Sequence, residues 1–319
     1  MLAIGIDIGG TSIKGAAVYD NGKMLDIFSM PVIKGESGEE TINKLIDLVS
    51  SYIIYQGIAD QVAGIGIGIP GLLDVNKGVV VMSNNLKWED LPIADMFKAK
   101  LPYPVRIAND ANVAAYGEAL YGAGKGVPYV IMLTLGTGVG GGIVLDGELY
   151  EGNNGQGAEL GHIVVQYGGR ECTCQRRGCL ERYASATALV IDTKEAMDKH
   201  PESLMHKIVE EQGKIDGRVA FKAARQGDPT ALAVVEQYIY YLSEGILNYC
   251  NIFRPNVVIL SGGIANEGAY LFDRVNAYLA KERYGYPRSP AVTVVPAILG
   301  YDSGKIGAAA LFLRHENNN

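Results

Sequence analysis

Apolar residues along the chain recur at every second position in some segments and at every third or fourth in others, which indicates alternating strands and helices. Near the start, isoleucines occupy positions 4, 6 and 8 ahead of Gly9, and 127 positions later Ile131, Leu133 and Leu135 precede Gly136 in the same way. Each segment continues into a second apolar stretch and a hairpin signal, Asp20-Asn21-Gly22 in one and Asp146-Gly147 in the other. The pattern predicts two similar hairpins with glycine turns, half a chain apart.

The rest of the pattern predicts an α/β protein. The stretch Ser37-Gly38-Glu39-Glu40 has capping-box spacing and precedes apolar residues at helical spacing as far as Tyr52. We expect further strands at 62–69, 105–108, 129–135, 257–260 and 292–295, and helices from 110 towards 120, near 181–192, at 229–251 and from about 302. A chain of 319 residues indicates two domains. We place the small N-terminal α/β domain at 1–119 plus 303–319, and the large C-terminal α/β domain, which holds a cysteine-bearing loop, at 120–302.

Composition excludes several classes of protein. The 35 acidic and 28 basic side chains give a formal charge of -7, which disfavours nucleic acid as a partner. No run of 18 apolar residues and no signal-peptide pattern occurs, so we expect a cytoplasmic protein without a membrane partner. Four cysteines, three of them crowded together, do not form a disulfide framework and fit a reducing compartment.

Two glycine turns are candidates for phosphate binding. In Asp7-Ile8-Gly9-Gly10-Thr11, small residues let an anion approach the backbone N–H groups, Thr11 adds a hydroxyl, and Asp7 can hold magnesium through water. Leu135-Gly136-Thr137-Gly138 has similar parts. When each turn is considered alone, a tight hairpin that needs glycine for positive φ explains it as well as phosphate binding does. The presence of one such turn in each predicted domain favours a cleft that binds a nucleoside triphosphate between the two domains.

A third glycine pair and the lack of rival motifs favour the nucleotide hypothesis. Ser261-Gly262-Gly263 directly follows the strand expected at 257–260 and can form a floor for the rest of the nucleotide. The match to G-x-G-x-x-G at Gly136, Gly138 and Gly141 lies between two strands, whereas a dinucleotide site needs a helix there. No P-loop motif occurs.

Asp110 and the cysteine stretch can each be interpreted in more than one way from the residues alone. Asp110 follows an expected strand and opens an expected helix, which suits a catalytic base but also an ordinary helix N-cap. The stretch CTCQRRGCLE holds Cys172, Cys174 and Cys179 and ends on Glu181. Three thiols without a clear fourth ligand do not define a metal site, a redox centre or a packing cluster.

The combination of motifs resembles the ROK family of sugar kinases and sugar-responsive repressors. The resemblance covers essentially the whole chain and rests on Asp7-Ile8-Gly9-Gly10-Thr11, Asn109-Asp110, Gly136-Thr137-Gly138, Glu159-Leu160-Gly161-His162 and the cysteine stretch 172–181. It implies the two-domain actin-like ATPase (ribonuclease H-like) fold with a central cleft. The chain departs from the family at Gln175, where glycine usually follows the second cysteine. Asp7 lies almost at the start, so we expect no helix-turn-helix domain.

The resemblance also implies roles for the site residues. Asp110 becomes the general base, and Asn109, Asp110, Glu159, His162 and Glu181 contact the sugar. ATP with Mg²⁺ would bind at Asp7, Gly9, Gly10, Thr11, Gly136, Thr137, Gly138, Gly262 and Gly263. His162 lies ten residues before Cys172 and completes a Cys₃His set with Cys172, Cys174 and Cys179, which suits structural, tetrahedral Zn²⁺.

The predicted function is ATP-dependent phosphorylation of a hexose at its 6-hydroxyl, with glucose as the first candidate because Glu159 is the glucose-type residue of the family. Mannose, fructose, allose and N-acetylhexosamines such as N-acetylmannosamine stay open as substrates, and polyphosphate stays open as a donor. A non-catalytic sugar sensor and a filament-forming ATPase are the alternatives from other classes. The family also suggests a homodimer.

Overall fold

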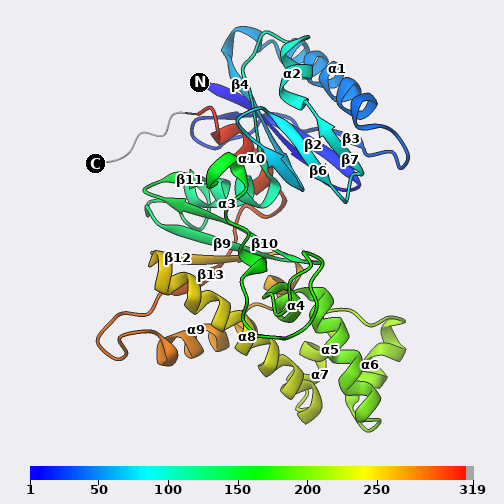
Figure 1. The fold of residues 1–319 in the computed structure, drawn as a ribbon, viewed down its shortest axis with the longest axis vertical. Coiled ribbons are helices and arrows are strands. Elements are labelled where there is room, and N and C mark those ends of the chain that lie inside the picture. Colours follow the sequence, from blue (N-terminus) through cyan, green and yellow to red (C-terminus); the bar gives the residue numbers. More distant parts are fainter. Residues whose placement is uncertain (314–319) are drawn as a thin grey trace. The chain divides into compact units, whose positions relative to one another are not determined.

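The computed structural model describes residues 1–313 and contains two compact units. Unit 1 comprises Met1–Pro128, Gly142–Ala158 and the segment that begins at Ile298, and unit 2 comprises Tyr129–Gly141 and Glu159–Ala297. Figure 1 shows the helices and strands of both. No helix in the described part of the chain is long and apolar enough to cross a membrane.

Unit 1 is built on a five-stranded sheet in the order β3-β2-β1-β4-β8. The hairpin of β1 (Leu2–Ile8) and β2 (Ser12–Tyr19) is antiparallel, β4 (Val62–Ile69) lies parallel to β1, and β8 (Val105–Asn109) lies parallel to β4. The short edge strand is β3 (Phe28–Pro31). The predicted first hairpin is confirmed, and the carboxyl ends of β1 and β8 carry Asp7 and Asn109.

Helix α1 (Gly38–Gln56) confirms the predicted capping box, since the Ser37 side chain accepts from the N–H of Glu40 and the Glu40 side chain accepts from the N–H of Ser37. The helix ends at Gly57, whose φ of 64° is left-handed and favours glycine. Its apolar side contributes Ile42, Leu45 and Val49 to the main core of the unit.

Helix α10 (Ser303–Ala310) packs against β1 and against α3 (Asp110–Tyr121). The approach is close, because a Cβ at Gly66 would lie 1.8 Å from the carbonyl oxygen of Ala308 and one at Gly307 would lie 1.7 Å from that of Val113. Only glycine permits such contact between backbones. This packing sets the first turn of α10 beside the end of β1.

A small sheet of β5 (Leu72–Asp74), β6 (Val79–Ser83) and β7 (Trp88–Leu91) also belongs to unit 1, together with α2 (Ile93–Lys98). The second five-stranded sheet has the order β11-β10-β9-β12-β13. Its strands are β9 (Val130–Leu135), β10 (Val139–Leu145), β11 (Glu148–Tyr150), β12 (Val257–Ser261) and β13 (Thr293–Pro296). The turn between β10 and β11 has φ of 53° at Asp146 and 79° at Gly147, so the second predicted hairpin signal is confirmed.

The helices of unit 2 gather around α8 (Pro229–Phe253), which packs against α4 (Glu181–Ala184), α5 (Ala186–Lys199), α7 (Val219–Arg225) and α9 (Ala269–Glu282) (Figure 1). Helix α6 (Leu204–Gln212) packs against α7. Two buried tyrosines of α8 bind backbone carbonyls outside the helix: the Tyr238 hydroxyl donates to the carbonyl of Ala184 at the end of α4, and that of Tyr249 donates to the carbonyl of Leu160 in the short 3-10 helix Leu160–His162.

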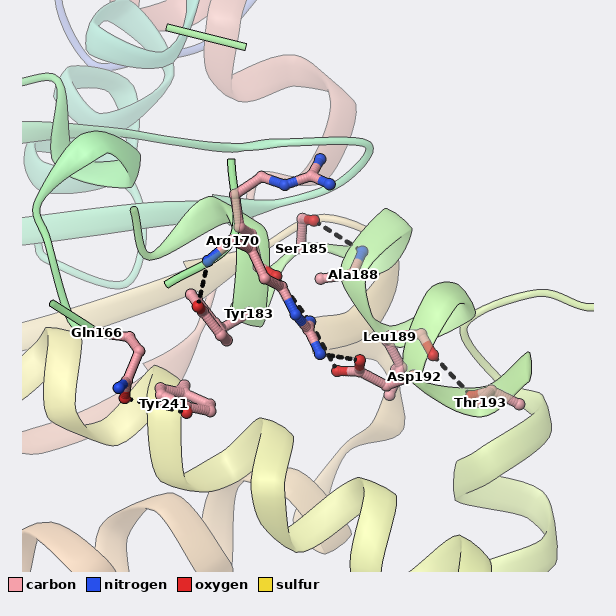
Figure 2. Close-up of polar contacts among 10 residues, drawn as sticks. Gln166, Arg170, Tyr183, Ser185, Ala188, Leu189, Asp192, Thr193 and Tyr241 are labelled. Atoms are coloured by element: carbon pink, nitrogen blue, oxygen red, sulfur yellow. Dashed lines mark hydrogen bonds and ion pairs between the residues drawn. The ribbon is translucent and has the colours of Figure 1, made fainter. Parts of the chain in front are cut away.

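One predicted helix is divided in two. The sequence pattern predicted a single helical stretch near 181–192, but the chain breaks at Ser185, which has extended φ and ψ of -86° and 165°. Its side chain accepts from the N–H of Ala188 and caps α5 (Figure 2). The break turns the four residues that begin with Glu181 into a separate short helix.

Candidate active site

The first glycine turn of unit 1 has the open backbone that phosphate binding needs. The Gly9 N–H donates to the carbonyl of Ser12 at 2.9 Å, which closes the turn, and a Cβ at Gly10 would meet no atom within 4 Å. Open space beside exposed N–H groups lets an anion approach the backbone.

The Asp7 carboxylate lies at the inner side of this turn, beside the start of α10. A Cβ at Gly304 would lie 2.7 Å from Asp7 Oδ2. Burial raises the pKa of the Asp7 carboxyl, and the charges of Lys305 and Lys14 oppose this rise. Because a half-buried carboxylate gains from a nearby cation, the chemistry of Asp7 fits a magnesium ligand.

Sequence reasoning missed Lys305. Its side chain is only 1% exposed, and Nζ lies 2.8 Å from Asp302 Oδ1 and donates to the carbonyl of Tyr301 at 3.0 Å. A lysine within the otherwise small and apolar sequence of α10 was the available signal. Lys14, by contrast, is exposed; it lies opposite Asp7 in the strand register, and its charge opposes the rise of the Asp7 pKa.

Asn109 and Asp110 share the junction between β8 and α3. Asn109 is the N-cap of α3, because its Oδ1 accepts from the N–H groups of Ala111 and Asn112 at 2.9 and 3.3 Å. Asp110 is instead the first residue of the helix, and its Oδ1 accepts from Ala111 at 2.9 Å. The N-cap of α3 is therefore Asn109, and not Asp110 as one interpretation of the sequence proposed. Both cap bonds use Oδ1, so Nδ2 is the part of Asn109 that suits a sugar oxygen.

Unit 2 brings together the other two predicted nucleotide segments. The turn 136–138 is closed by the Gly136 N–H, which donates to the Gly138 carbonyl at 3.0 Å, and is tied to α5 by the Ala186 N–H, which donates to the Gly136 carbonyl at 2.8 Å. A Cβ at Gly262 would lie 2.4 Å from the carbonyl oxygen of Leu135. With its φ of 90°, Gly262 is a position that requires glycine, and it holds Gly263 close to the end of β9.

The four predicted metal ligands converge. One ligand atom from each of His162, Cys172, Cys174 and Cys179 lies within 4.8 Å of all the others. Cys172 Sγ is 3.6 Å from His162 Nδ1, and the Sγ atoms of Cys174 and Cys179 are 3.6 Å apart. Tetrahedral zinc with bonds of about 2.0–2.3 Å separates its ligand atoms by roughly 3.3–3.8 Å. The donor set and these two separations of 3.6 Å therefore fit a structural zinc ion.

Two residues of the cysteine loop adopt left-handed backbone. Gly178 has φ of 83°, and Gln175 has φ of 69°, a conformation that favours glycine. Gln175 occupies the position where the family usually has glycine, so the loop keeps the left-handed turn despite the substitution. Burial, followed by the hydrogen bonds that the Cys179 thiol donates to the neighbouring sulfurs of Cys174 and Cys172, raises the pKa of the Cys179 thiol to about 12, and a metal ion would replace that proton.

Glu181 connects the cysteine loop to the glycine turn. Its Oε2 accepts from the N–H of Val139 at 3.0 Å, and a Cβ at Gly138 would lie 2.2 Å from the same oxygen. Glu159 is exposed and precedes the short 3-10 helix Leu160–His162, where the N–H of His162 donates to the Glu159 carbonyl at 3.0 Å. With Nδ1 of His162 facing Cys172, Nε2 is the nitrogen left for a sugar.

The predicted site residues thus form one group in each unit. Unit 1 holds the turn 7–11 together with Asn109 and Asp110. Unit 2 holds the turn 136–138, the glycine pair 262–263 and the loop from Glu159 to Glu181. Unit 1 therefore carries one predicted phosphate turn and the predicted base, and unit 2 carries the other predicted phosphate turn and the predicted hydroxyl acceptors.

Comparison with known proteins agrees with these motifs. The family model described as "ROK family" matches residues 3–315. The chain belongs to the ROK family. This ROK protein is 35% identical over 318 residues to the glucokinase of Halalkalibacterium halodurans, a match that spans 99% of this chain and 96% of the relative. It is 36% identical to the glucokinase of Thermotoga maritima, a match that spans 97% of this chain and 96% of the relative.

Solved structures give the same result. The ROK glucokinase of Streptomyces griseus, solved in complex with glucose and AMPPNP, has a TM-score of 0.78 and 33% identity over 98% of this chain and 99% of that one. These matches confirm the predicted α/β, two-domain actin-like ATPase fold. Repressors match as well, since the xylose repressor of Bacillus spizizenii is 29% identical over 98% of this chain and 77% of the repressor.

Proposed function

We propose that this ROK protein is an ATP-dependent sugar kinase that phosphorylates a hexose at its 6-hydroxyl, with glucose as the preferred substrate. The observation that carries the proposal is a hydrogen bond between the two predicted parts of the site. The Glu181 carboxylate, at the end of the cysteine stretch 172–181, accepts from the N–H of Val139 beside Gly138. A predicted sugar-binding residue thus touches a predicted phosphate turn. Similarity to glucokinases over nearly the whole chain supports the same function.

In the proposed reaction, Asp110 acts as the general base. The sugar hydroxyl oxygen attacks the γ-phosphorus of ATP, the bond from that phosphorus to the β–γ bridging oxygen breaks, and ADP leaves. The hydroxyl proton passes to the Asp110 carboxylate and then to solvent. The N–H groups of both glycine turns and the hydroxyls of Thr11 and Thr137 bind phosphate oxygens. Magnesium, when bound at Asp7, supplies positive charge at the triphosphate.

The sugar is held by Asn109, Glu159, His162 and Glu181. Carboxylates and an imidazole nitrogen accept hydrogen bonds, so they suit a ring of hydroxyl donors and disfavour analogues that lack a hydroxyl. Zinc at the Cys₃His set has a structural role, because four protein ligands leave no open position for a substrate. It fixes His162 through Nδ1 and the start of the segment that carries Glu181.

A panel of sugars and donors tests the proposal. Purified protein is assayed for ADP release with glucose, mannose, fructose, allose and N-acetylmannosamine, and for sugar phosphate with ATP or polyphosphate as donor. We expect the highest kcat/KM with glucose and ATP. The Asp110→Asn variant, purified in parallel, controls for contaminating kinases.

A sugar-sensing protein without turnover is the second candidate, favoured by the repressors that match nearly the whole chain. It predicts that a sugar binds, as measured by calorimetry, while no sugar in the panel is phosphorylated with either donor. That combination of results would exclude the kinase proposal.

A further inference from the structure

Arg170 binds the segment after Glu181 through both its backbone and its side chain. Its backbone N–H donates to the Tyr183 hydroxyl at 2.8 Å, and its Nη1 donates to the carbonyl of Arg182 at 3.0 Å. Its own carbonyl accepts from the N–H of Gly178 at 2.8 Å. The residue therefore connects the loop before Cys172 with the chain on both sides of Glu181; Figure 2 shows its bond to Tyr183.

The guanidinium of Arg170 also pairs with Asp192 on α5. Nη1 donates to Oδ2 at 3.2 Å and Nη2 donates to Oδ1, so the pair is bidentate. The Asp192 side chain is only 10% exposed and that of Arg170 29%, which separates this pair from ordinary surface pairs. Burial raises the pKa of the Asp192 carboxyl, and the hydrogen bonds and charge of Arg170 oppose that rise. Loss of either partner leaves the other charge half-buried without compensation.

Aromatic rings extend the same connection to α8. The guanidinium of Arg170 lies 4.9 Å from the centre of the Tyr183 ring, and the Tyr183 and Tyr241 rings are 4.3 Å apart. The Tyr241 hydroxyl donates to Gln166 Oε1 at 3.4 Å. Figure 2 shows these side chains grouped between the loop and α8. Arg170 is thus fixed directly to α4 and α5, and through the Tyr183 ring to Tyr241 on α8, without touching any of the four metal-ligand side chains in the bonds described.

We propose that Arg170 and Asp192 form a second anchor for Glu181, which holds the sugar-binding segment independently of the metal ion. The inference rests on the proposed function, because only there does Glu181 bind the sugar. Both residues act through Glu181, so they are positioning residues and do not touch the substrate. A metal ion held at the Cys₃His set would fix the chain at Cys179, two residues before Glu181. Arg170 fixes it at Arg182 and Tyr183, immediately after Glu181.

Two variants and a matched control test the anchor. Arg170→Met and Asp192→Asn each break the bidentate pair. Arg177→Met is the control, because Arg177 belongs to the same loop and pairs with Glu171, but the two side chains are 55% and 81% exposed. An exposed ion pair contributes little to the free energy of folding. Arg170→Lys, which keeps the charge and loses the bidentate geometry, replaces Arg170→Met if that variant does not fold.

The first readout is hydrogen–deuterium exchange, which needs no substrate. The N–H groups of residues 182–185 donate to the carbonyls of Cys179, Leu180 and Glu181, and we expect them to exchange at least several-fold faster in Arg170→Met and Asp192→Asn than in the wild type. Arg177→Met should exchange at the wild-type rate. Zinc content, measured by mass spectrometry, should be the same in all four proteins.

The second readout is the affinity for sugar without nucleotide, measured by calorimetry. Misplacement of Glu181 by about 1 Å should weaken sugar binding about 10- to 100-fold, whereas the KM for nucleotide stays within twofold. The double variant Arg170→Met/Asp192→Asn should resemble the single variants, because each breaks the same pair.

Unchanged exchange in both folded variants overturns the anchor, and so does faster exchange with unchanged sugar affinity. Loss of zinc from either variant would show that the anchor depends on the metal site, which contradicts the inference as well. A wild-type protein that binds no sugar in the panel would instead refute the proposed function, and the exchange data would still decide whether the anchor exists.

Discussion

A methyl group at Gly138 would meet the Glu181 carboxylate directly. The Cβ of Gly138→Ala would lie 2.2 Å from Glu181 Oε2, the oxygen that now accepts from the Val139 N–H at 3.0 Å. Ordinary contact between carbon and oxygen needs about 3.4 Å, so the carboxylate must move by about 1 Å. A move of that size lengthens the bond to Val139 beyond the range of a hydrogen bond.

The expected effect on sugar affinity follows from the displacement, because a carboxylate that moves by about 1 Å also loses the hydrogen bond that a sugar hydroxyl would donate to it. A hydrogen bond to a charged group contributes about 1.5–3 kcal/mol, and about 1.4 kcal/mol corresponds to a tenfold change in affinity. We therefore expect Gly138→Ala to weaken sugar binding about 10- to 100-fold. Stability should fall by no more than about 3 kcal/mol, the upper value for the lost bond to Val139, because φ at Gly138 is not left-handed and the displaced group is the end of a flexible side chain.

Gly136→Ala is the matched control, since a Cβ there would meet no atom within 4 Å. Sugar affinity is measured by calorimetry without nucleotide, and unfolding is followed by circular dichroism. Gly136→Ala should bind sugar within twofold of the wild type. Equal sugar affinity in both variants would refute the placement of Glu181 in the sugar site, and a large loss of stability in Gly138→Ala would refute the geometric argument.

Three further predictions concern the base and the two metal ions. Asp110→Asn should fold normally and bind sugar but lose turnover by about 10²- to 10⁴-fold, so wild-type turnover would exclude Asp110 as the base. Asp7→Ala should raise the concentrations of magnesium and nucleotide needed for half-maximal activity while sugar affinity stays the same; loss of both would indicate a role in folding. Removal of zinc by a chelator should disorder the loop 159–181 and weaken sugar binding, with recovery when zinc is restored. Fully active protein without zinc would contradict this metal assignment.

Much of the fold was predictable because local signals and tertiary packing agree. The capping box at Ser37 predicted α1, and the hairpin signals at Asn21-Gly22 and Asp146-Gly147 predicted turns that the structure contains. The division of the 181–192 stretch was not predicted, because an apolar period does not show that Ser185 adopts extended backbone and caps a new helix. The short strands β5, β6 and β7 were also missed, since three to five residues give too little periodicity.

The residues of the candidate site were predictable where a motif carries its own chemistry. His162 and the three cysteines are ligand types at metal-site spacing, and the structure brings their ligand atoms together. Lys305 and Arg170 were missed because their importance comes from burial and from partners distant in sequence. A lysine or arginine read from sequence alone is expected to be solvated. Only the packed structure shows which of these charges is enclosed.

The position of the transferred phosphoryl group tests the central claim most directly. The protein is incubated with glucose, ATP and magnesium, and the product is identified by two-dimensional ¹H–³¹P NMR, with 6-deoxyglucose as the control substrate and Asp110→Asn as the control enzyme. The account predicts glucose 6-phosphate from glucose, no phosphorylated product from 6-deoxyglucose and almost none with Asp110→Asn. Phosphate on another hydroxyl, or no sugar phosphate from any hexose of the panel, would contradict it.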